Sequence, residues 1–209
     1  MGSNMNDDKK LSDLDISALI QEMREERDNQ ILGNLGMTPK ITIREMTAAD
    51  PPQIACAFTA QGWDKPESQF VRYEQESREG KRVNLLAEVD GHFAGYVTVV
   101  WASDYPPFLA AGIPEIVDFN VLINYRRQRI GTTLMDAAEE VAGQRSPVVG
   151  VGVCLHVDYA AAQVLYVKRG FVPDGRGVYY QGRYPGYGDR VEIGDDLTLY
   201  LTKRLRDRE

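Results

Sequence analysis

The chain has 209 residues, of which 24 are Lys or Arg and 31 are Asp or Glu, giving a net charge of −7. This length allows one domain with a full hydrophobic core, which needs neither a disulfide nor a metal to stabilise it. The acidic balance argues against nucleic acid or an anionic membrane as a partner. Cys56 and Cys154 are predicted to be reduced and buried, and His92 and His156 offer no spacing for a zinc site.

No segment of the sequence has the pattern of a membrane span or a secretion signal. The longest apolar runs, 95–102 and 148–155, have the length of strands, well below the ~20 residues of a spanning helix. The first residues, Met-Gly-Ser-Asn, resemble an expression tag ahead of a native Met5, and no apolar stretch follows them. We therefore expect a cytoplasmic protein.

Residues 1–38 are predicted to form a segment of their own, and the domain proper occupies 39–209. The first ten residues are polar and predicted to be disordered. An amphipathic helix then begins near Leu11 and ends by Gly33 or Gly36. Its apolar stripe has to pack against either the domain or a second subunit, so the sequence leaves a homodimer open. The stripe consists of Ile16, Leu19, Ile20 and Met23.

Strand and helix patterns follow one another from residue 39 onwards. Strands are predicted at 41–44, 83–89, 93–101, 115–122 and 148–155, and further strands within 171–205. Helices are predicted to begin at Pro51 and to cover 65–79, 130–144 and 160–169. The Asp90-Gly91 pair predicts a tight hairpin, and 105–107 has the composition of a Pro-rich loop. This order favours an α+β or mixed α/β sheet over a doubly wound one.

A cluster of arginines precedes the helix predicted at 130–144. Arg126, Arg127 and Arg129 lie where the first N–H groups of the helix have no carbonyl partner. Basic side chains oppose the helix dipole at this end, and a bound anion would offset that cost. Gly131 lets a ligand approach the backbone. The pattern favours a phosphate site over a solvated basic turn, and it matches neither of the common nucleotide loops.

Two blocks of the sequence resemble the GNAT superfamily of N-acetyltransferases. Residues 126–131, RRQRIG, resemble its pyrophosphate motif [Q/R]-x-x-G-x-[G/A], with Arg129 in place of the middle glycine. Residues 159–171 resemble its N-x-x-A-x-x-L-Y-x-K-x-G-F block, with Tyr159 in place of Asn. The opening strand and turn, 41–50, are also similar, so that the resemblance spans about 40–205.

The resemblance implies the fold and the co-substrate. The fold would be an α/β (α+β) one, with a mixed, mostly antiparallel sheet that splays between its fourth and fifth strands and is flanked by helices. Acetyl-CoA would be the co-substrate, with no metal. Its pantetheine arm would pair with the strand ending at Val121, whose backbone N–H would polarise the thioester carbonyl. The loop residues expected to bind it are Arg126, Arg127, Gln128, Arg129, Ile130, Gly131 and Thr132, with Tyr159 from the second block.

The chemistry of acetyl transfer needs a general acid and a general base. Tyr166 is the Tyr of the second block, and it is the expected acid because a phenol with a pKa of about 10 holds its proton at neutral pH. Glu115 is the expected base, by analogy with the glutamate of histone-acetylating members. Asp118 and His156 are rivals for the role, and Asp118 could instead support its strand or bind the amine.

The acceptor side is predicted to be acidic and aromatic. A tyrosine-rich stretch, 179–189, could line a pocket or pack as a hairpin, and Trp63, Tyr73, Trp101 and Tyr105 are further aromatic candidates. Asp104 and Asp158 would join the two acids above in attracting a cationic amine.

We therefore expect direct transfer to a small cationic amine, because no nucleophilic cysteine motif is present. A regulatory acyl-CoA-binding module, a transferase of another acyl group and a protein amine as acceptor remain alternatives.

Overall fold

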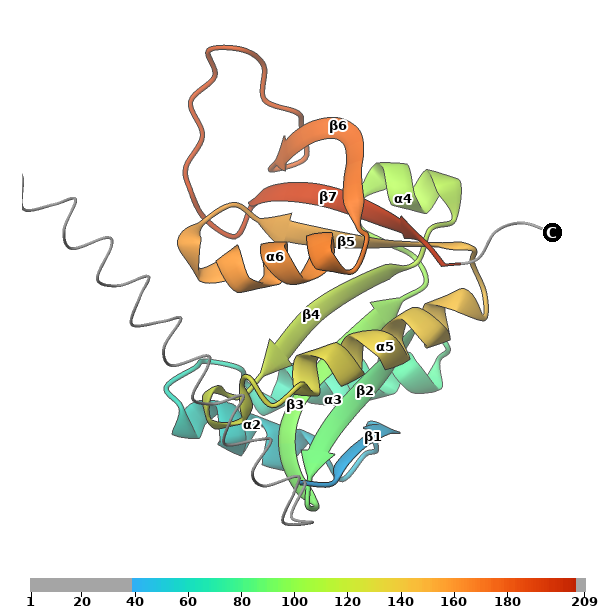
Figure 1. The fold of residues 1–209 in the computed structure, drawn as a ribbon, viewed down its shortest axis with the longest axis vertical. Coiled ribbons are helices and arrows are strands. Elements are labelled where there is room, and N and C mark those ends of the chain that lie inside the picture. The colour runs from blue at the N-terminus through green and yellow to red at the C-terminus, as the bar shows by residue number, and fades with distance from the viewer. Residues whose placement is uncertain (1–38, 206–209) are drawn as a thin grey trace, which may run out of the picture. The chain divides into compact units, whose positions relative to one another are not determined.

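The computed structural model describes residues 39–205. The helix predicted before residue 39 therefore lies outside the described residues. A seven-stranded sheet has the order β1-β2-β3-β4-β5-β7-β6 (Figure 1). The strands are β1 (Ile41–Glu45), β2 (Arg82–Val89), β3 (His92–Val100), β4 (Glu115–Val121), β5 (Val148–Cys154), β6 (Val172–Tyr180) and β7 (Leu197–Arg204). The α-helices are α2 (Pro51–Ala60), α3 (Glu67–Arg78), α4 (Pro106–Ala111), α5 (Ile130–Gly143) and α6 (Ala160–Lys168).

The sheet is mixed and mostly antiparallel, as predicted. The pairs β2–β3, β3–β4, β5–β7 and β6–β7 are antiparallel, whereas β4 and β5 run parallel. The β2–β3 turn confirms the predicted hairpin, because Asp90 and Gly91 have φ angles of 50° and 82°, the left-handed values that a tight turn requires.

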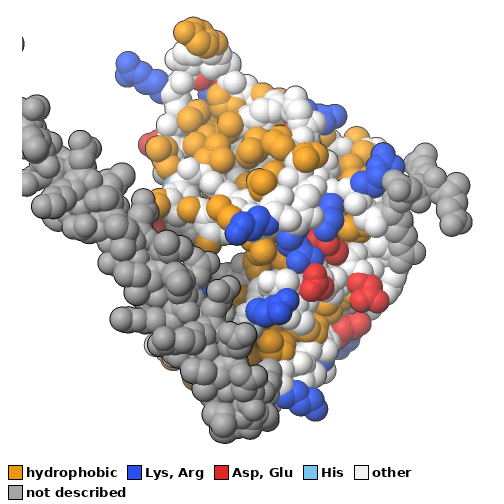
Figure 2. Space-filling view, in the orientation of Figure 1, with side chains coloured by type: hydrophobic (Ala, Val, Ile, Leu, Met, Phe, Trp, Pro, Cys, Tyr) orange, Lys and Arg blue, Asp and Glu red, His pale blue; other side chains and the backbone are white. Residues whose placement is uncertain are grey.

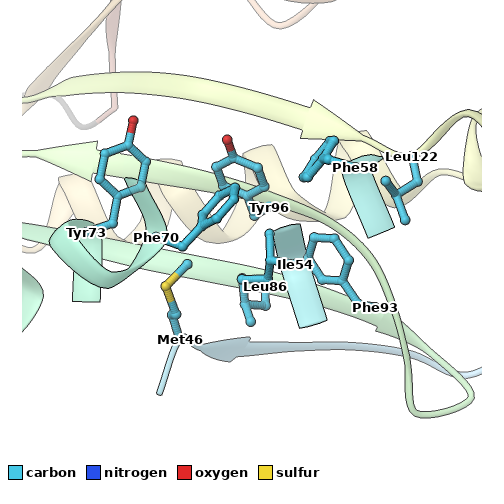
Figure 3. Close-up of a cluster of buried hydrophobic side chains, with 9 residues drawn as sticks. All are labelled: Met46, Ile54, Phe58, Phe70, Tyr73, Leu86, Phe93, Tyr96 and Leu122. Atoms are coloured by element: carbon cyan, nitrogen blue, oxygen red, sulfur yellow. The ribbon is translucent and has the colours of Figure 1, made fainter. Parts of the chain in front are cut away.

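Helices cover both faces of the β2–β4 part of the sheet. Helix α5 lies on the face towards the viewer in Figure 1, and α2 and α3 lie behind β2 and β3. Aromatic and aliphatic side chains from α2, α3 and the two strands form one core cluster (Figure 3). On the other face, the helix predicted over 130–144 is present as α5, and its buried residues are Ile130, Leu134, Met135, Ala138 and Ala142.

The two halves of the sheet separate between β4 and β5. Only Glu115 and Ile116 of β4 have partners in β5, Gly150 and Val151 respectively. Further along β4, Val117, Asn120 and Val121 pair with β3 alone, and Figure 1 shows β4 and β5 diverging. Beside the paired end, the ring of Phe108 occupies the space where a side chain at Gly150 would lie, because a Cβ there would be 2.1 Å from it.

Two expectations from the sequence are wrong. The Pro-rich stretch expected to be a loop forms the first turn of α4, because proline is tolerated where helical N–H groups have no intrahelical partner. Cys56 is exposed on α2, although Cys154 is buried as predicted, and both are free thiols. Helical position therefore determines the exposure of Cys56 more than its apolar neighbours in sequence do.

The face that carries α5 and α6 has a mixed surface. In Figure 2, Lys and Arg side chains lie over its middle next to Asp and Glu, and hydrophobic side chains gather over its upper half. Val164 and Val167 of α6 are among the exposed hydrophobic residues. No broad basic surface appears on this face.

Candidate active site

Glu115 is a buried carboxyl at the paired end of β4 and β5. Its side chain accepts a hydrogen bond of 2.5 Å from Ser103 Oγ, and that oxygen accepts one of 2.9 Å from the N–H of Tyr105. Burial raises the pKa of Glu115 to about 7, with the Ser103 hydrogen bond opposing the rise and the charge of Asp104 adding to it. A carboxyl with this pKa can accept a proton near neutral pH.

Tyr166 and Tyr200 lie near this carboxyl. Burial raises the pKa of the Tyr166 phenol, and Cys154 and Glu115 raise it further. The pKa of Tyr200 is raised by burial and then by the charge of Glu115. Gly152 makes the approach possible, because a Cβ there would lie 3.0 Å from the Tyr200 ring and 3.4 Å from Glu115 Oε1. Tyr166 therefore keeps its proton at neutral pH beside a group that can take one up.

Asp118, the rival base, has its carboxylate engaged by other side chains. Lys65 Nζ lies 2.7 Å from Oδ1, and the Tyr96 hydroxyl donates to Oδ2 at 2.5 Å. Burial would raise the pKa of Asp118, but the charge of Lys65 and these hydrogen bonds outweigh it and the pKa is lowered. Its proton affinity is therefore the opposite of what a base near pH 7 needs.

His156, the other rival, faces two aspartates beyond the end of β5. Its ring nitrogens lie 3.2 Å from Asp195 Oδ1 and 3.4 Å from Asp158 Oδ2. The Tyr159 hydroxyl donates to the same Asp195 oxygen at 3.3 Å, and burial raises the pKa of Tyr159. Tyr159 and His156 therefore belong to one local polar cluster around Asp195.

The segment 126–129, called the arginine loop from here on, has the backbone shape of a glycine-rich turn. Arg127 and Arg129 have φ angles of 60° and 64°, and Arg129 is the N-cap residue of α5. Arg129 stands where the motif has its middle glycine, which is the residue that adopts this conformation without strain. The first N–H groups of α5 follow directly, at Ile130, Gly131 and Thr132, and a helix leaves such groups without a carbonyl partner.

Other contacts hold this loop against the end of β4. The Arg126 guanidinium lies over the Trp63 ring and its Nε donates weakly to the Val121 carbonyl at 3.4 Å. Gln128 Nε2 donates to the Asn124 carbonyl. A Cβ at Gly131 would lie 3.0 Å from the Phe119 ring. The absence of a side chain at this position therefore allows β4 to pack closely, as well as allowing a ligand to approach the backbone.

Between Glu115 and the arginine loop, strand β4 carries backbone groups that have no strand partner on the side of β5. The N–H of Leu122 donates to Ala94 of β3, and neighbouring residues of a strand direct their N–H groups to opposite sides. The N–H of Val121 therefore points to the side of β5, where β4 has no partner in this stretch. Glu115 and Val121 are the two ends of β4, roughly 20 Å apart at ~3.3 Å per residue, which suits an elongated ligand.

An aromatic cluster lies next to Glu115, and sequence reasoning did not assemble it. The Tyr105 ring stacks on Tyr200 with centroids 3.6 Å apart, and its hydroxyl contacts Asp174 and Tyr184, each at 2.7 Å. Tyr179 completes the cluster. The sequence offers Tyr105 and the tyrosine-rich stretch 179–189 as separate candidates for the acceptor pocket. No local sequence pattern marks Ser103, Asp174 or Tyr200 as part of a site. Only the pairing of β5, β6 and β7 brings them together.

Comparison with known proteins gives the family of the chain. The model of the acetyltransferase (GNAT) family matches residues 44–171. The chain belongs to the GNAT family of acetyltransferases. The family expected from the arginine loop and the second block is thereby confirmed. No curated protein matches the chain in sequence.

Solved structures agree with this fold. An N-acetyltransferase that acts on the alanine of ribosomal protein S18 in Escherichia coli is 16% identical, with a TM-score of 0.58 and coverage of 81% of this chain and 97% of that one. A Salmonella typhimurium protein, solved with its cofactor acetyl-CoA, is 17% identical, with a TM-score of 0.59 and coverage of 80% and 95%.

No helix within residues 39–205 is long and apolar enough to cross a membrane. No group of three or more His, Cys, Asp or Glu side chains in this part of the chain is arranged to hold a metal ion.

Proposed function

We propose that this GNAT-family protein transfers an acetyl group from acetyl-CoA to the primary amine of a small cationic molecule. The observation that carries the proposal is a pair of groups near the point where β4 and β5 separate. The buried Glu115 has a pKa of about 7, and the nearby Tyr166 keeps its proton because its pKa is raised. These groups have the proton affinities that amine acetylation needs from a base and an acid.

The residues of the arginine loop fit acetyl-CoA. Arg126, Arg127 and Arg129 supply guanidinium groups for its phosphates, and the backbone N–H groups of Arg127, Arg129, Gly131 and Thr132 supply oriented donors at the positive end of α5. The side chains of Gln128 and Ile130 hold the loop and the helix start in place. The left-handed backbone at Arg127 and Arg129 supports this assignment, because it turns successive N–H groups towards one side.

The unpaired edge of β4 fits the rest of the co-substrate. An extended chain can pair with such an edge as an added strand, and the N–H of Val121 would then donate to it. Acetyl-CoA supplies an activated acyl group as a thioester. Backbone donors at the thioester carbonyl lower the barrier to acyl transfer because they stabilise the charge that develops on its oxygen.

Glu115 and Tyr166 divide the proton transfers between them. Glu115 takes a proton from the ammonium group of the acceptor, directly or through a water, and so frees the nitrogen lone pair. Tyr166 gives its proton to the departing thiolate. Cys154 does not take part as a nucleophile, because its thiol is buried, its pKa is raised, and it donates to the Asp195 carbonyl at 3.0 Å. Transfer is therefore direct, within a ternary complex.

The acceptor side next to Glu115 suits a cation with apolar parts. Tyr179 and Tyr200 present half-buried aromatic rings there, with the buried Tyr105 ring stacked on Tyr200, and aromatic rings bind cations and alkyl groups. Asp104 and the acidic net charge of the chain add a negative potential that attracts amines. The same surface could accept the N-terminus of a protein, the type of acceptor named for the Escherichia coli neighbour.

The test is release of CoA from acetyl-CoA with a panel of polyamines, aminoglycosides, amino acids and peptide N-termini. Small cationic amines should be acetylated, and Tyr166→Phe should lower kcat by about 100-fold while changing acetyl-CoA affinity little. Tyr125→Phe, which loses a hydroxyl from a ring packed against the core cluster of α2 and α3, is the matched control. Binding of acetyl-CoA without turnover of any amine would indicate a regulatory module instead. Preference for peptides, or for propionyl- or succinyl-CoA, would overturn the substrate assignment.

A further inference from the structure

The ammonium group of Lys65 is bound by the kinds of groups that recognise an ammonium ligand. Lys65 belongs to the segment between α2 and α3, and its Nζ lies 2.7 Å from Asp118 Oδ1 and 3.0 Å from the Tyr96 hydroxyl. The centroids of the Phe58 and Tyr96 rings lie 5.6 Å and 5.5 Å from this nitrogen, within the range of a cation–π interaction. Asp118, Tyr96 and Phe58 therefore form an ammonium site that the chain fills with its own side chain.

Lys65 is not the only residue that holds the Asp118 carboxylate in the ammonium site. Neutral side chains donate hydrogen bonds to both of its oxygens, and Figure 3 shows the hydroxyls of two of them, Tyr73 and Tyr96, pointing the same way out of the apolar cluster. Because these donors fix the carboxylate, another cation could take the place of the Lys65 ammonium group. The neutral donors are Tyr96 at 2.5 Å, Gln69 and Asn120 at 2.8 Å and Tyr73 at 3.0 Å.

The ammonium site lies on the same face of the sheet as Glu115. In the pairing of β3 with β4, Glu115 is opposite Val100. Asn120 is opposite Tyr96 in the same pairing. Val100 and Tyr96 are four residues apart in one strand and therefore point to one face, and their partners in β4 share this face. The Asp118 carboxylate accepts hydrogen bonds from Tyr96 and Asn120, so it lies on this face too.

The carboxylates of Glu115 and Asp118 are close enough for one ligand to reach both. Asp118 follows Glu115 by three residues in β4, which is roughly 10 Å at ~3.3 Å per residue. The side chains of Lys65 and Asp118 have exposed fractions of 18% and 19%, so solvent reaches the pair. A long diamine with one nitrogen at Glu115 would bring its second ammonium group towards Asp118. Lys65 occupies that place, and its charge repels another cation.

We propose that Lys65 determines the acceptor specificity: by filling the ammonium site at Asp118, it restricts the acceptor to a monoamine, with one ammonium group at Glu115 and an apolar remainder. The proposal rests on the proposed function and narrows its substrate class. The half-buried rings of Tyr179 and Tyr200 suit the apolar remainder of such an amine. Diamines and polyamines are poor acceptors, because their second ammonium group meets a carboxylate that is already paired.

The test compares hexylamine with hexamethylenediamine, which adds a second ammonium group at the far end of the same chain. Lys65→Met empties the ammonium site, and Lys65→Gln replaces it if the Met variant does not fold. Lys65→Arg keeps a positive charge, and Lys65→Met with Asp118→Asn removes both charges. Lys81→Met, which removes an exposed lysine elsewhere, is the matched control. Steady-state kinetics with acetyl-CoA gives kcat and KM for each amine, and calorimetry gives the affinity of the CoA-loaded protein for each amine.

The ratio of kcat/KM for the two amines reports the effect of the second ammonium group. We expect the wild-type protein to prefer hexylamine. Lys65→Met should shift the ratio by at least about tenfold towards the diamine, as expected for a hydrogen bond to a charged group, and the shift should lie in KM because the group binds away from the reacting nitrogen. Lys65→Arg, the double variant and Lys81→Met should all stay near the wild-type ratio.

An unchanged ratio in Lys65→Met would overturn the proposal, and so would a wild-type preference for the diamine. An equal shift in the double variant would overturn it too, because the Asp118 carboxylate would then not bind the second ammonium group. If the wild-type protein acetylates no amine, the proposed function fails. The calorimetric affinities then decide about Lys65: a gain of diamine binding in Lys65→Met that the double variant lacks supports its role, and no such gain overturns it.

Discussion

Replacing Glu115 with Gln should make the protein more stable and less active. Gln has nearly the same shape and can still accept the hydrogen bond from Ser103 Oγ, but it carries no charge. The carboxyl is buried, and burial raises its pKa from 4.5 to about 7. The folded protein therefore binds a proton that the unfolded chain releases between these two pH values.

The size of the effect follows from this shift. Each pKa unit corresponds to about 1.4 kcal/mol, so the wild-type protein loses roughly 3 kcal/mol of folding free energy as pH rises through the range between the unfolded and the folded pKa. The stabilising contribution is complete below the unfolded pKa and is lost above the folded one. The Gln variant keeps it at every pH.

Thermal unfolding between pH 4.5 and pH 8.5 measures the effect. The two proteins should unfold at similar temperatures at the acid end, and the Gln variant should unfold roughly 6–12 °C higher at pH 8, at about 2–4 °C per kcal/mol for a domain of this size. Glu140→Gln, on the exposed side of α5, is the control. Its unfolding temperature should not diverge from that of the wild-type protein as pH rises. The kcat/KM of the wild-type protein should rise with pH, and the midpoint of this rise should lie at a pH of about 7. The kcat/KM of Glu115→Gln should be at least about 100-fold lower than that of the wild-type protein. A constant or reversed difference in unfolding temperature would refute the reasoning.

Three further substitutions test other parts of the site. Ser103→Ala removes a hydrogen bond that favours ionised Glu115, so the acid limb of the kcat/KM profile should move up by about one pH unit; an unmoved limb would contradict this role. Gly131→Glu should abolish acetyl-CoA binding by calorimetry, and Gly131→Ala, which only crowds the Phe119 ring, should weaken it far less. Arg129→Gly should raise stability by about 1 kcal/mol, because it relieves the positive φ, and should weaken acetyl-CoA binding about tenfold; unchanged affinity would remove the side chain from the phosphate site.

Local sequence signals were sufficient for most elements of the fold. The Asp90-Gly91 turn and the helix over 130–144 depend on neighbours within one hairpin or one helix, and both are confirmed. Helix α4 was missed because Pro106 and Pro107 look like a loop when their position in the first turn is unknown.

The candidate site depends on partners that are far apart in sequence. The burial of Glu115 requires Gly152 and Tyr200, which come from strands that pair only after folding. Tyr159, expected to bind the co-substrate, donates a hydrogen bond to Asp195, a residue of the chain between β6 and β7 that no local pattern connects with it. A motif gives the type of residue and its element, but not these contacts.

Two carboxylates three residues apart on one strand acquire opposite proton affinities. Glu115 meets a hydroxyl, aromatic rings and another acid, so that burial dominates and its pKa rises. Asp118 is buried as well, but a lysine and several hydrogen-bond donors reach it, and its pKa falls. Environments that push two acids apart in this way assign their roles, because only the group that titrates near neutral pH can exchange a proton during turnover. The net charge of −7 is thus less informative than its distribution: one acid of β4 can bind a proton near neutral pH, and the other stays ionised beside a lysine.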